Sequence, residues 1–226
     1  MALMNFARTL RKVGLIPYRH SPRVFGIGLS KTGTTSLGVA LRHLGFRHKT
    51  YDAELLEKWH LGKVDEVLAG IEAYSSFEDF PYPLMYDALM RRYNRSARYI
   101  LTVRKSPKIW LESLKAHALR APPDRSRYRK MAYGFEYPHQ NEKAHIEFYN
   151  DHIKSVKAAS VAHNVSDLLI EVCWEQHDGW PELCALLDMA EPGVRFPYAN
   201  RGMDKSDLQY EKVNLERIAN LMAIRD

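Results

Sequence analysis

The sequence predicts an α/β protein of three layers, in which helices cover both faces of a central, mainly parallel sheet. Three short apolar runs, at residues 24–29, 99–103 and 167–173, have the composition of buried strands. Segments with helical periodicity follow each of them. Strands that alternate with helices are typical of a parallel sheet, which binds ligands at the carboxyl ends of its strands.

The size and composition of the chain suit one globular domain without disulfides. Of its 226 residues, 46% are hydrophobic and 27% are charged. We expect residues 1–22 to be an N-terminal lead-in and residues 23–226 to form a single domain. Cys173 and Cys184 lack the spacing of a metal site or a redox pair, so we expect two buried free thiols.

The charge and hydropathy of the chain limit its partners. A net charge of +6 favours anions such as phosphorylated small molecules, whereas no nucleic-acid-binding motif is recognisable. No apolar stretch is long enough to span a membrane or to form a secretory signal, so we expect a cytoplasmic protein. Met1–Leu15 has two open interpretations, a basic helix at a membrane surface or a helix packed on the domain.

The first strand, residues 24–29, leads into a loop of small polar residues and then a helix at 34–44 that ends before Gly45. The N-terminus of a helix presents unpaired N–H groups and a positive dipole end, so we expect an oxyanion there. Gly33 lets the backbone approach the anion, and Lys31 adds a charge. The predicted anion-binding residues are Ser30, Lys31, Thr32, Gly33, Thr34, Thr35 and Ser36.

This loop differs in one respect from the nucleoside-triphosphate loop G-x-x-x-x-G-K-[ST]. Gly28 and Gly33 have the required spacing, but Thr34 stands where that motif has its lysine, and the lysine lies earlier, at Lys31. The loop therefore retains the glycines of an anion-binding loop but carries its lysine at an earlier position. The alternative is an ordinary Ser/Thr-rich turn, which explains the glycines and the lysine less well.

The remaining elements are predicted in chain order. Residues 46–72 are polar and partly helical, with 53–58 and 63–72 as the best segments, and a short strand is expected at 73–77. The later elements are a helix from Pro83 to Tyr93, a strand at 99–103, a helix capped by Ser106 that runs from Pro107 to Leu119, a flexible basic loop at 121–134, the longest helix at 141–163, a strand at 167–173, a short helix at 181–187 and a terminal helix at 205–224.

A second anion site is predicted at the end of the second strand. Arg104 leaves the carboxyl end of this strand, on the same rim as the loop, and Ser113 lies on the following helix on the face of Ser106 and Trp110. An arginine and a hydroxyl together can bind an anion. The alternative is a surface arginine that pairs with a nearby carboxylate.

Together these motifs resemble a known family. Lys31–Thr35 is similar to the 5′-phosphosulfate loop of sulfotransferases, which commonly reads P-K-S-G-T-T. Further segments resemble the bacterial branch of this superfamily, so that the resemblance covers most of residues 24–202: they are Phe77–Pro81, Ile100–Trp110, Gly179–Cys184 and Phe196–Asn200. The resemblance implies the P-loop-NTPase-like sulfotransferase fold and 3′-phosphoadenosine 5′-phosphosulfate (PAPS) as co-substrate.

The resemblance also implies residue assignments. The loop would hold the 5′-phosphate of PAPS, and Arg104 with Ser113 would hold the 3′-phosphate, although their separation is nine residues here and eight in the family. Arg201, in Asn200-Arg201-Gly202, corresponds to a further 3′-phosphate ligand of many relatives. Lys31 would stabilise the leaving oxygen, and no metal is required.

Asp79 and Glu78 are the candidate bases that accept the proton of the acceptor. In cytosolic relatives the base is a histidine two residues before a proline, and Asp79 stands in that position relative to Pro81. Other branches use a glutamate, which keeps Glu78 as a candidate. Either carboxylate could instead stabilise the N-terminus of the helix that begins at Pro83.

The predicted function is the transfer of a sulfuryl group from PAPS to a hydroxyl or amine of a carbohydrate, small molecule or lipid, with 3′,5′-adenosine bisphosphate as product. Three alternatives stay open: a P-loop small-molecule kinase or NTPase, a non-catalytic nucleotide-binding protein, and a nucleic-acid binder. Acceptor specificity is expected to lie in residues 46–72 and 115–145. His43 and His48 are candidate lining residues of the acceptor pocket, and aromatic residues at 128–137 are a candidate lid.

Overall fold

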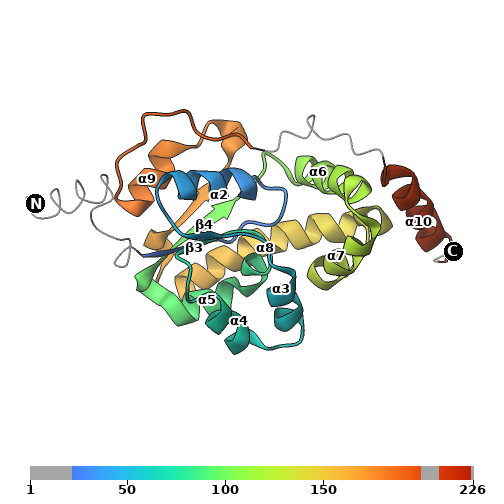
Figure 1. Ribbon diagram of the computed structural model, residues 1–226, viewed down its shortest axis with the longest axis horizontal. Coiled ribbons are helices and arrows are strands. Elements are labelled where there is room, and N and C mark those ends of the chain that lie inside the picture. Colours follow the sequence, from blue (N-terminus) through green and yellow to red (C-terminus); the bar gives the residue numbers. More distant parts are fainter. Residues whose placement is uncertain (1–21, 200–208, 225–226) are drawn as a thin grey trace, which may run out of the picture.

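A computed structural model describes residues 22–199 and 209–224 as an α/β structure with helices on both faces of one sheet (Figure 1). Its strands are β1 (Arg23–Gly26), β2 (His48–Lys49), β3 (Ser76–Phe77), β4 (Ala97–Thr102) and β5 (Leu169–Val172). Their order is β2-β3-β1-β4-β5, and every neighbouring pair is parallel. The predicted three-layer fold class is therefore confirmed. The division into a lead-in and one domain stays a prediction, and Met1–Leu15 lies outside the described residues.

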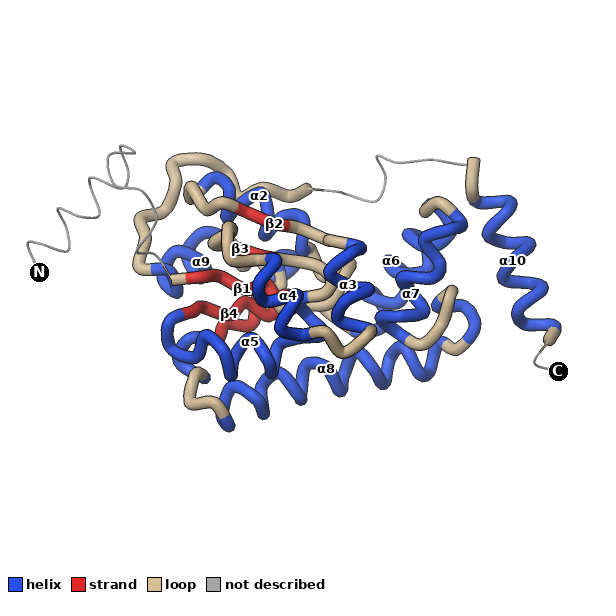
Figure 2. The backbone as a smooth tube through the Cα atoms, turned by 60° about the horizontal axis from the view of Figure 1, so that its bottom comes forward, coloured by secondary structure: helices blue, strands red, loops and turns tan. Residues whose placement is uncertain are grey.

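The helices are α2 (Thr34–His43), α3 (Ala53–His60), α4 (Val64–Gly70), α5 (Tyr86–Tyr93), α6 (Pro107–Arg120), α7 (Ser126–Tyr133), α8 (Glu142–Ala162), α9 (Trp180–Leu187) and α10 (Glu211–Ala223). Short 3-10 turns are found at Tyr82–Met85, Asn94–Ser96, Pro123–Arg125, Pro138–Gln140, Ser166–Leu168 and Trp174–Gln176. In Figure 2 the strands form the centre and α10 lies at one end of the molecule, beside α6. No helix within the described ranges is long and apolar enough to cross a membrane.

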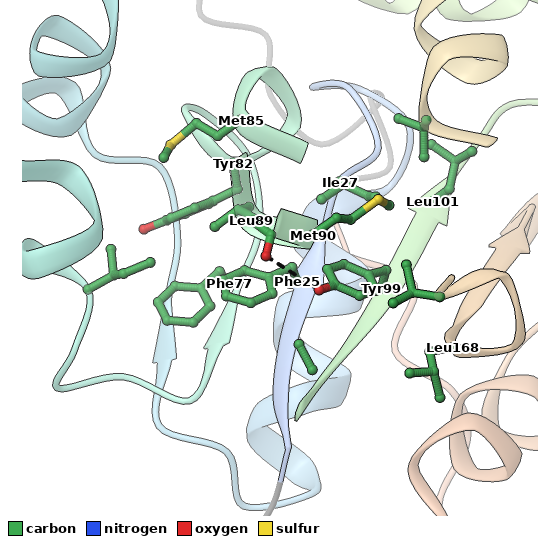
Figure 3. Close-up of a cluster of buried hydrophobic side chains, with 14 of the residues drawn as sticks. Phe25, Ile27, Phe77, Tyr82, Met85, Leu89, Met90, Tyr99, Leu101 and Leu168 are labelled. Atoms are coloured by element: carbon green, nitrogen blue, oxygen red, sulfur yellow. Dashed lines mark hydrogen bonds between the residues drawn. The ribbon is translucent and has the colours of Figure 1, made fainter. Parts of the chain in front are cut away.

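Alternate side chains of the central strands point to opposite faces and form two separate cores. On one face, Val24, Ile100 and Val172 are buried beneath α2 and α9. On the other, Phe25 and Tyr99 are buried beneath α5 and α8 (Figure 3). The strands are buried on both faces, which is why they are continuous apolar runs in the sequence.

Aromatic rings dominate the second of these cores. The rings of Phe25 and Phe77 stack with their centroids 4.9 Å apart, and the Tyr99 ring lies 6.1 Å from that of Phe25. The Tyr99 hydroxyl donates to the Asn94 carbonyl at 3.1 Å, which ties β4 to the turn before it. This packing fixes the positions of β1, β3 and β4, whose carboxyl ends carry the predicted site residues.

Two predictions about secondary structure need correction. The short strand β2 was not predicted, because its two residues, His48 and Lys49, are polar and lie at the edge of the sheet. Residues 121–134 were predicted as a flexible loop but contain α7. This helix forms because Ala132 and Tyr133 are buried against the core cluster of α6, and Gly134, at φ 82°, ends it.

Other predicted features are confirmed, with shifted boundaries. The hydroxyl of Ser106 caps α6 by accepting from the N–H of Ile109 at 3.2 Å. β1 ends at Gly26, earlier than predicted, although Ile27 N–H still donates to the Ile100 carbonyl at 2.8 Å. Both cysteines are buried free thiols. Within the predicted terminal helix, α10 begins at Glu211, and residues 205–208 lie outside the described ranges.

Candidate functional site

The loop between β1 and α2 makes a tight turn that depends on glycine. Lys31 and Gly33 have left-handed backbone conformations, with φ 73° and 96°. A Cβ atom on Gly33 would lie 2.3 Å from Cδ1 of Trp174, so no other residue fits there without movement. A Cβ atom on Gly28 would lie 2.1 Å from the Thr102 hydroxyl, which explains the second glycine of the motif.

Two indole rings hold the carbonyls of this loop. Nε1 of Trp110 donates to the Ser30 carbonyl at 2.9 Å, and Nε1 of Trp174 donates to the Gly33 carbonyl at 3.1 Å. Gly33 is the N-cap of α2 and has no side chain that could cap the helix. The backbone N–H groups of the first turn are therefore not bonded to an N-cap side chain. The loop is therefore rigid and polar, as anion binding at a helix N-terminus requires.

A cleft of about 570 Å³ opens above this loop at the carboxyl ends of the strands. It is lined by Ser30, Lys31, Thr32, Gly33, Thr34, Thr35, Asp79, Val103, Arg104, Ile109, Ser113, Ala116, His117, Arg120, Trp174, Glu175, Tyr198 and Ala199. The cleft thus brings together most of the site residues predicted from the sequence. Arg201 lies outside the described residues.

Two hydroxyls of the predicted loop are occupied within the protein. The Thr32 hydroxyl donates to the Leu29 carbonyl at 2.6 Å and lies 2.5 Å from the Thr102 hydroxyl. The Ser36 hydroxyl accepts the N–H of Ala199 at 3.0 Å, and Ser36 does not line the cleft. These two hydroxyls support the loop. Thr34 and Thr35 line the cleft, as does Thr32.

Arg104 is positioned by groups on three sides. Its Nη1 donates to the Lys31 carbonyl at 3.0 Å, and its Nη2 donates to Oε1 of Glu175 at 2.6 Å. Its backbone N–H donates to the Tyr149 hydroxyl at 2.9 Å. The buried Nε atom has no hydrogen-bond partner. Arg104 therefore pairs with a carboxylate, as the alternative in the sequence analysis expects, and it also lines the cleft.

Asp79 occupies the centre of the site. Its backbone has φ 64°, and its Oδ1 accepts the N–H of Phe80 at 2.8 Å. Burial, and next the negative charge of Glu78, raise the pKa of Asp79 to about 7. The Phe80 N–H and the charge of Lys31 limit this rise. A carboxyl group with such a pKa is suited to proton transfer near neutral pH.

Glu78 lies elsewhere. It is buried, its Oε1 accepts the hydroxyl proton of Thr50, and the same oxygen lies 3.5 Å from Nε2 of His48. Glu78 does not line the cleft. The two adjacent carboxylates thus face different surroundings: the chain leaves β3 at Phe77 and turns at Asp79, whose backbone is left-handed.

Sequence reasoning missed several residues of the cleft. His117 lies one helical turn after Ser113 on α6, a spacing that could have pointed to it. Loss of solvent and the charge of Lys31 lower the pKa of His117; its ring is open to the cleft, so water screens part of this effect. Trp174 and Glu175 follow β5 and give no local signal. His43 and His48 line neither this cleft nor the neighbouring cavity.

A second, smaller cavity of about 200 Å³ adjoins the cleft. Ser30, Asp79 and His117 line both spaces. The second cavity is otherwise lined by Tyr51, Phe80, Leu114, Ala121, Arg125, Tyr128, Arg129 and Tyr133. Asp79 and His117 therefore stand where a polar cleft meets an aromatic cavity.

No group of three His, Cys, Asp or Glu side chains that could hold a metal ion occurs in the part of the chain that the structure describes.

The chain has relatives among known proteins. The chain is similar to Ava biosynthesis cluster protein M of Aspergillus versicolor, with 25% identity over 217 residues that cover 78% of this chain and 80% of that protein. Residues 23–204 match the sulfotransferase domain family, and this range includes the loop, Asp79, Arg104 and Ser113. Because this match spans most of the sequence, the chain belongs to the sulfotransferase domain family.

Proposed function

We propose that this protein transfers a sulfuryl group from PAPS to the hydroxyl, or amine, of a small acceptor. The observation that carries the proposal is the meeting of two anion-binding groups and a carboxyl of raised pKa in one cleft. Membership of the sulfotransferase domain family supports sulfuryl transfer in general. We propose the cytoplasm as its location, as expected from the sequence.

In this proposal the two phosphates of PAPS bind at two separate groups of residues in the cleft. The N-terminus of α2, with Gly33, Thr34 and Thr35, receives the 5′-phosphate. Arg104, whose Nε has no partner, receives the 3′-phosphate together with Ser113. Glu175 holds the guanidinium of Arg104 in place and neutralises part of its charge until the phosphate arrives.

The proposed reaction is an in-line displacement at sulfur. A lone pair of the acceptor oxygen forms the new S–O bond while the bond from sulfur to the 5′-phosphate oxygen breaks. The electron pair of that bond leaves with 3′,5′-adenosine bisphosphate, and the acceptor proton passes to the Asp79 carboxylate. Lys31 stabilises the negative charge that develops on the leaving oxygen. Only the ionised form of Asp79 can accept the proton.

The position of the lysine separates this proposal from a kinase or NTPase. In nucleoside-triphosphate loops the lysine directly follows the second glycine, whereas Lys31 precedes Gly33. A second site for an anion at Arg104 suits a nucleotide that carries phosphates on both its 5′ and 3′ positions. A nucleoside triphosphate has no 3′-phosphate to fill it.

A transfer assay with PAPS labelled in its sulfuryl group tests the proposal. Purified protein is incubated with the label and with phenols, alcohols, amines, sugars and hydroxylated lipids in separate reactions. We expect labelled product with at least one class, and about a hundredfold less or lower with the Lys31→Ala variant. Transfer that is undiminished in this variant, or transfer of phosphate from ATP under the same conditions, would contradict the proposal.

A further inference from the structure

The cavity beside Asp79 contains a buried positive charge that the reaction described above does not use. Arg129, on α7, lines this cavity and is only 8% exposed. An arginine remains protonated in proteins, so its charge is buried together with the side chain. A buried charge is costly unless it is paired and fully hydrogen-bonded.

Arg129 is incompletely satisfied by the protein. Its Nε donates to the Glu136 carbonyl at 2.6 Å, and its guanidinium lies 4.8 Å from the centre of the Tyr137 ring. A side-chain hydrogen bond with Tyr137 and the negative charge of Glu136 also act on this guanidinium, but no ion pair within 4.0 Å joins it to a carboxylate of the described residues. Its buried Nη2 has no hydrogen-bond partner. A structural role explains the contacts of Nε but not the unpartnered Nη2.

The other walls of the cavity are aromatic, with one further buried polar atom. Tyr51, Phe80, Tyr128 and Tyr133 line it, and the rings of Phe80 and Tyr133 meet edge to face with centroids 5.4 Å apart. The Tyr133 hydroxyl is buried and has no partner, and burial raises the pKa of Tyr133, which keeps it a neutral donor. A flat, apolar group fits between such walls.

Charge in the cavity is unevenly distributed. Asp79 lines its junction with the cleft, whereas Arg125 and Arg129 line the rest. Burial, and next the positive charges of Lys31, Arg129, Arg120 and Arg125, lower the pKa of His117, so four cations lie near it. An anionic group would therefore be attracted to the arginine side and repelled from Asp79.

We infer that the acceptor is a small hydroxylated ring compound that carries one anionic group, bound with the ring between the tyrosines, the anion at Arg129 and the hydroxyl at Asp79. This inference rests on the proposed function, because it takes the cavity to be the acceptor site. The volume of about 200 Å³ admits one ring with a short side chain. A charge-assisted hydrogen bond from Nη2 of Arg129 to the anionic group would orient the acceptor, with its hydroxyl toward the cleft.

Two matched probes test the inference: 4-hydroxyphenylacetate and 2-(4-hydroxyphenyl)ethanol. Both contain a phenol ring. The first carries a carboxylate on its side chain, and the second carries a primary alcohol there. Their affinities for the wild-type protein are measured by calorimetry, with and without saturating 3′,5′-adenosine bisphosphate. We expect the acid to bind about tenfold more tightly or better, as a charge-assisted hydrogen bond predicts. Equal affinities, a preference for the alcohol, or no binding of either probe would overturn the inference.

Three variants assign the preference to Arg129. Arg129→Gln should abolish the preference for the acid, whereas Lys130→Gln, which removes an exposed charge from the same helix, should retain it. Because Arg129→Gln could unfold a buried site, Arg129→Lys is measured as well; it keeps the charge but not the fork, and should retain a reduced preference. An unchanged preference in a folded Arg129→Gln protein would also overturn the inference.

Failure of this inference and failure of the proposed function give different results. If the bisphosphate does not bind, the proposed donor is wrong, while the probes titrated alone still report on the cavity. If the bisphosphate binds and the two probes bind with equal affinity, the proposed donor site is supported and the inference of an anionic acceptor is wrong.

Discussion

The cleft and the cavity meet at Asp79 but are built in opposite ways. The cleft takes much of its lining from one continuous loop, residues 30–35, and its donors are backbone N–H groups and cations. The cavity takes Tyr51 from the segment after β2, Phe80 from the segment after β3, and most of the rest from α6 and α7. A site made by a continuous loop leaves a motif in the sequence, and a site assembled from distant side chains does not.

This difference has a physical reason. An anion of constant shape is bound by a backbone conformation, and that conformation requires glycine at fixed positions such as Gly33. An organic acceptor is bound by surfaces of side chains, which many sequences can supply. We therefore expect the properties of the cleft to be general and those of the cavity to be particular to this protein.

The largest expected effect is on the cleft. Lys31→Ala should lower kcat/KM by a factor of about a hundred to a thousand, because a preorganised charge at the leaving oxygen is lost. Lys105→Ala is the matched control: this lysine is exposed on the same rim but does not line the cleft. Steady-state kinetics with both variants measure the difference. Equal losses in the two would show that only the general positive charge of the rim matters.

The junction between the two regions should show the next largest effect. The wild-type rate should rise with pH through about 7, where Asp79 becomes ionised. Asp79→Asn should lower kcat about a hundredfold and remove this rise. Glu78→Gln should keep most of the rate, because Glu78 bonds to Thr50 outside the cleft. It should also keep the rise but move it to lower pH, because the Glu78 charge that helps to raise the pKa of Asp79 is removed. A rise that is lost in Glu78→Gln and retained in Asp79→Asn would reverse the assignment.

A smaller effect is expected from the support of the loop. Trp174→Phe removes the N–H that holds the Gly33 carbonyl and should weaken binding of 3′,5′-adenosine bisphosphate about fivefold to tenfold. Trp180→Phe makes the same chemical change where Nε1 donates to the Val194 carbonyl, and should leave this affinity unaltered. Binding is measured by calorimetry. A matching loss in both variants would indicate a general loss of packing.

The last expected effect concerns the stability of the fold and not binding or turnover. Asp79 has a pKa near 7 in the folded protein and about 3.8 otherwise, so its ionisation destabilises the folded state as pH rises through this range. Asp79→Asn should therefore raise the free energy of unfolding at pH 8 by on the order of 2 kcal/mol, reduced from the full shift because water in the cleft screens the charge. The gain should vanish as pH falls toward 4. Urea unfolding at several pH values measures it, and a gain that is independent of pH would contradict the raised pKa.

The sequence was informative wherever a local pattern determined the structure. The apolar runs predicted three of the five strands of the sheet, and a further apolar and polar segment before Glu78 correctly placed β3. The loop and Arg104 were brought into one cleft, as expected from strand ends on one rim. Their roles in binding PAPS remain predictions.

What the sequence did not reveal depends on tertiary contacts. The basic composition of residues 121–134 conceals the buried face of α7, which forms only against α6. Nothing local distinguishes Arg129 from the exposed arginines around it, because its burial depends on Glu136 and Tyr137. Likewise, the surroundings of Glu78 differ from those of Asp79 because β2 pairs with β3 and brings Thr50 to Glu78. The sequence shows two adjacent carboxylates but does not show which of them lines the cleft.

The central claim is that the cleft binds a nucleotide through two separate phosphates. Its most direct test compares 3′,5′-adenosine bisphosphate with adenosine 5′-monophosphate, which lacks only the 3′-phosphate, on the wild-type protein and on Arg104→Ala. The bisphosphate should bind the wild type at least about tenfold more tightly, and at a hundred times its Kd should stabilise the fold by about 2.7 kcal/mol. In Arg104→Ala the two affinities should become equal. Equal affinities in the wild type, or stronger stabilisation by ATP with Mg²⁺, would contradict the claim.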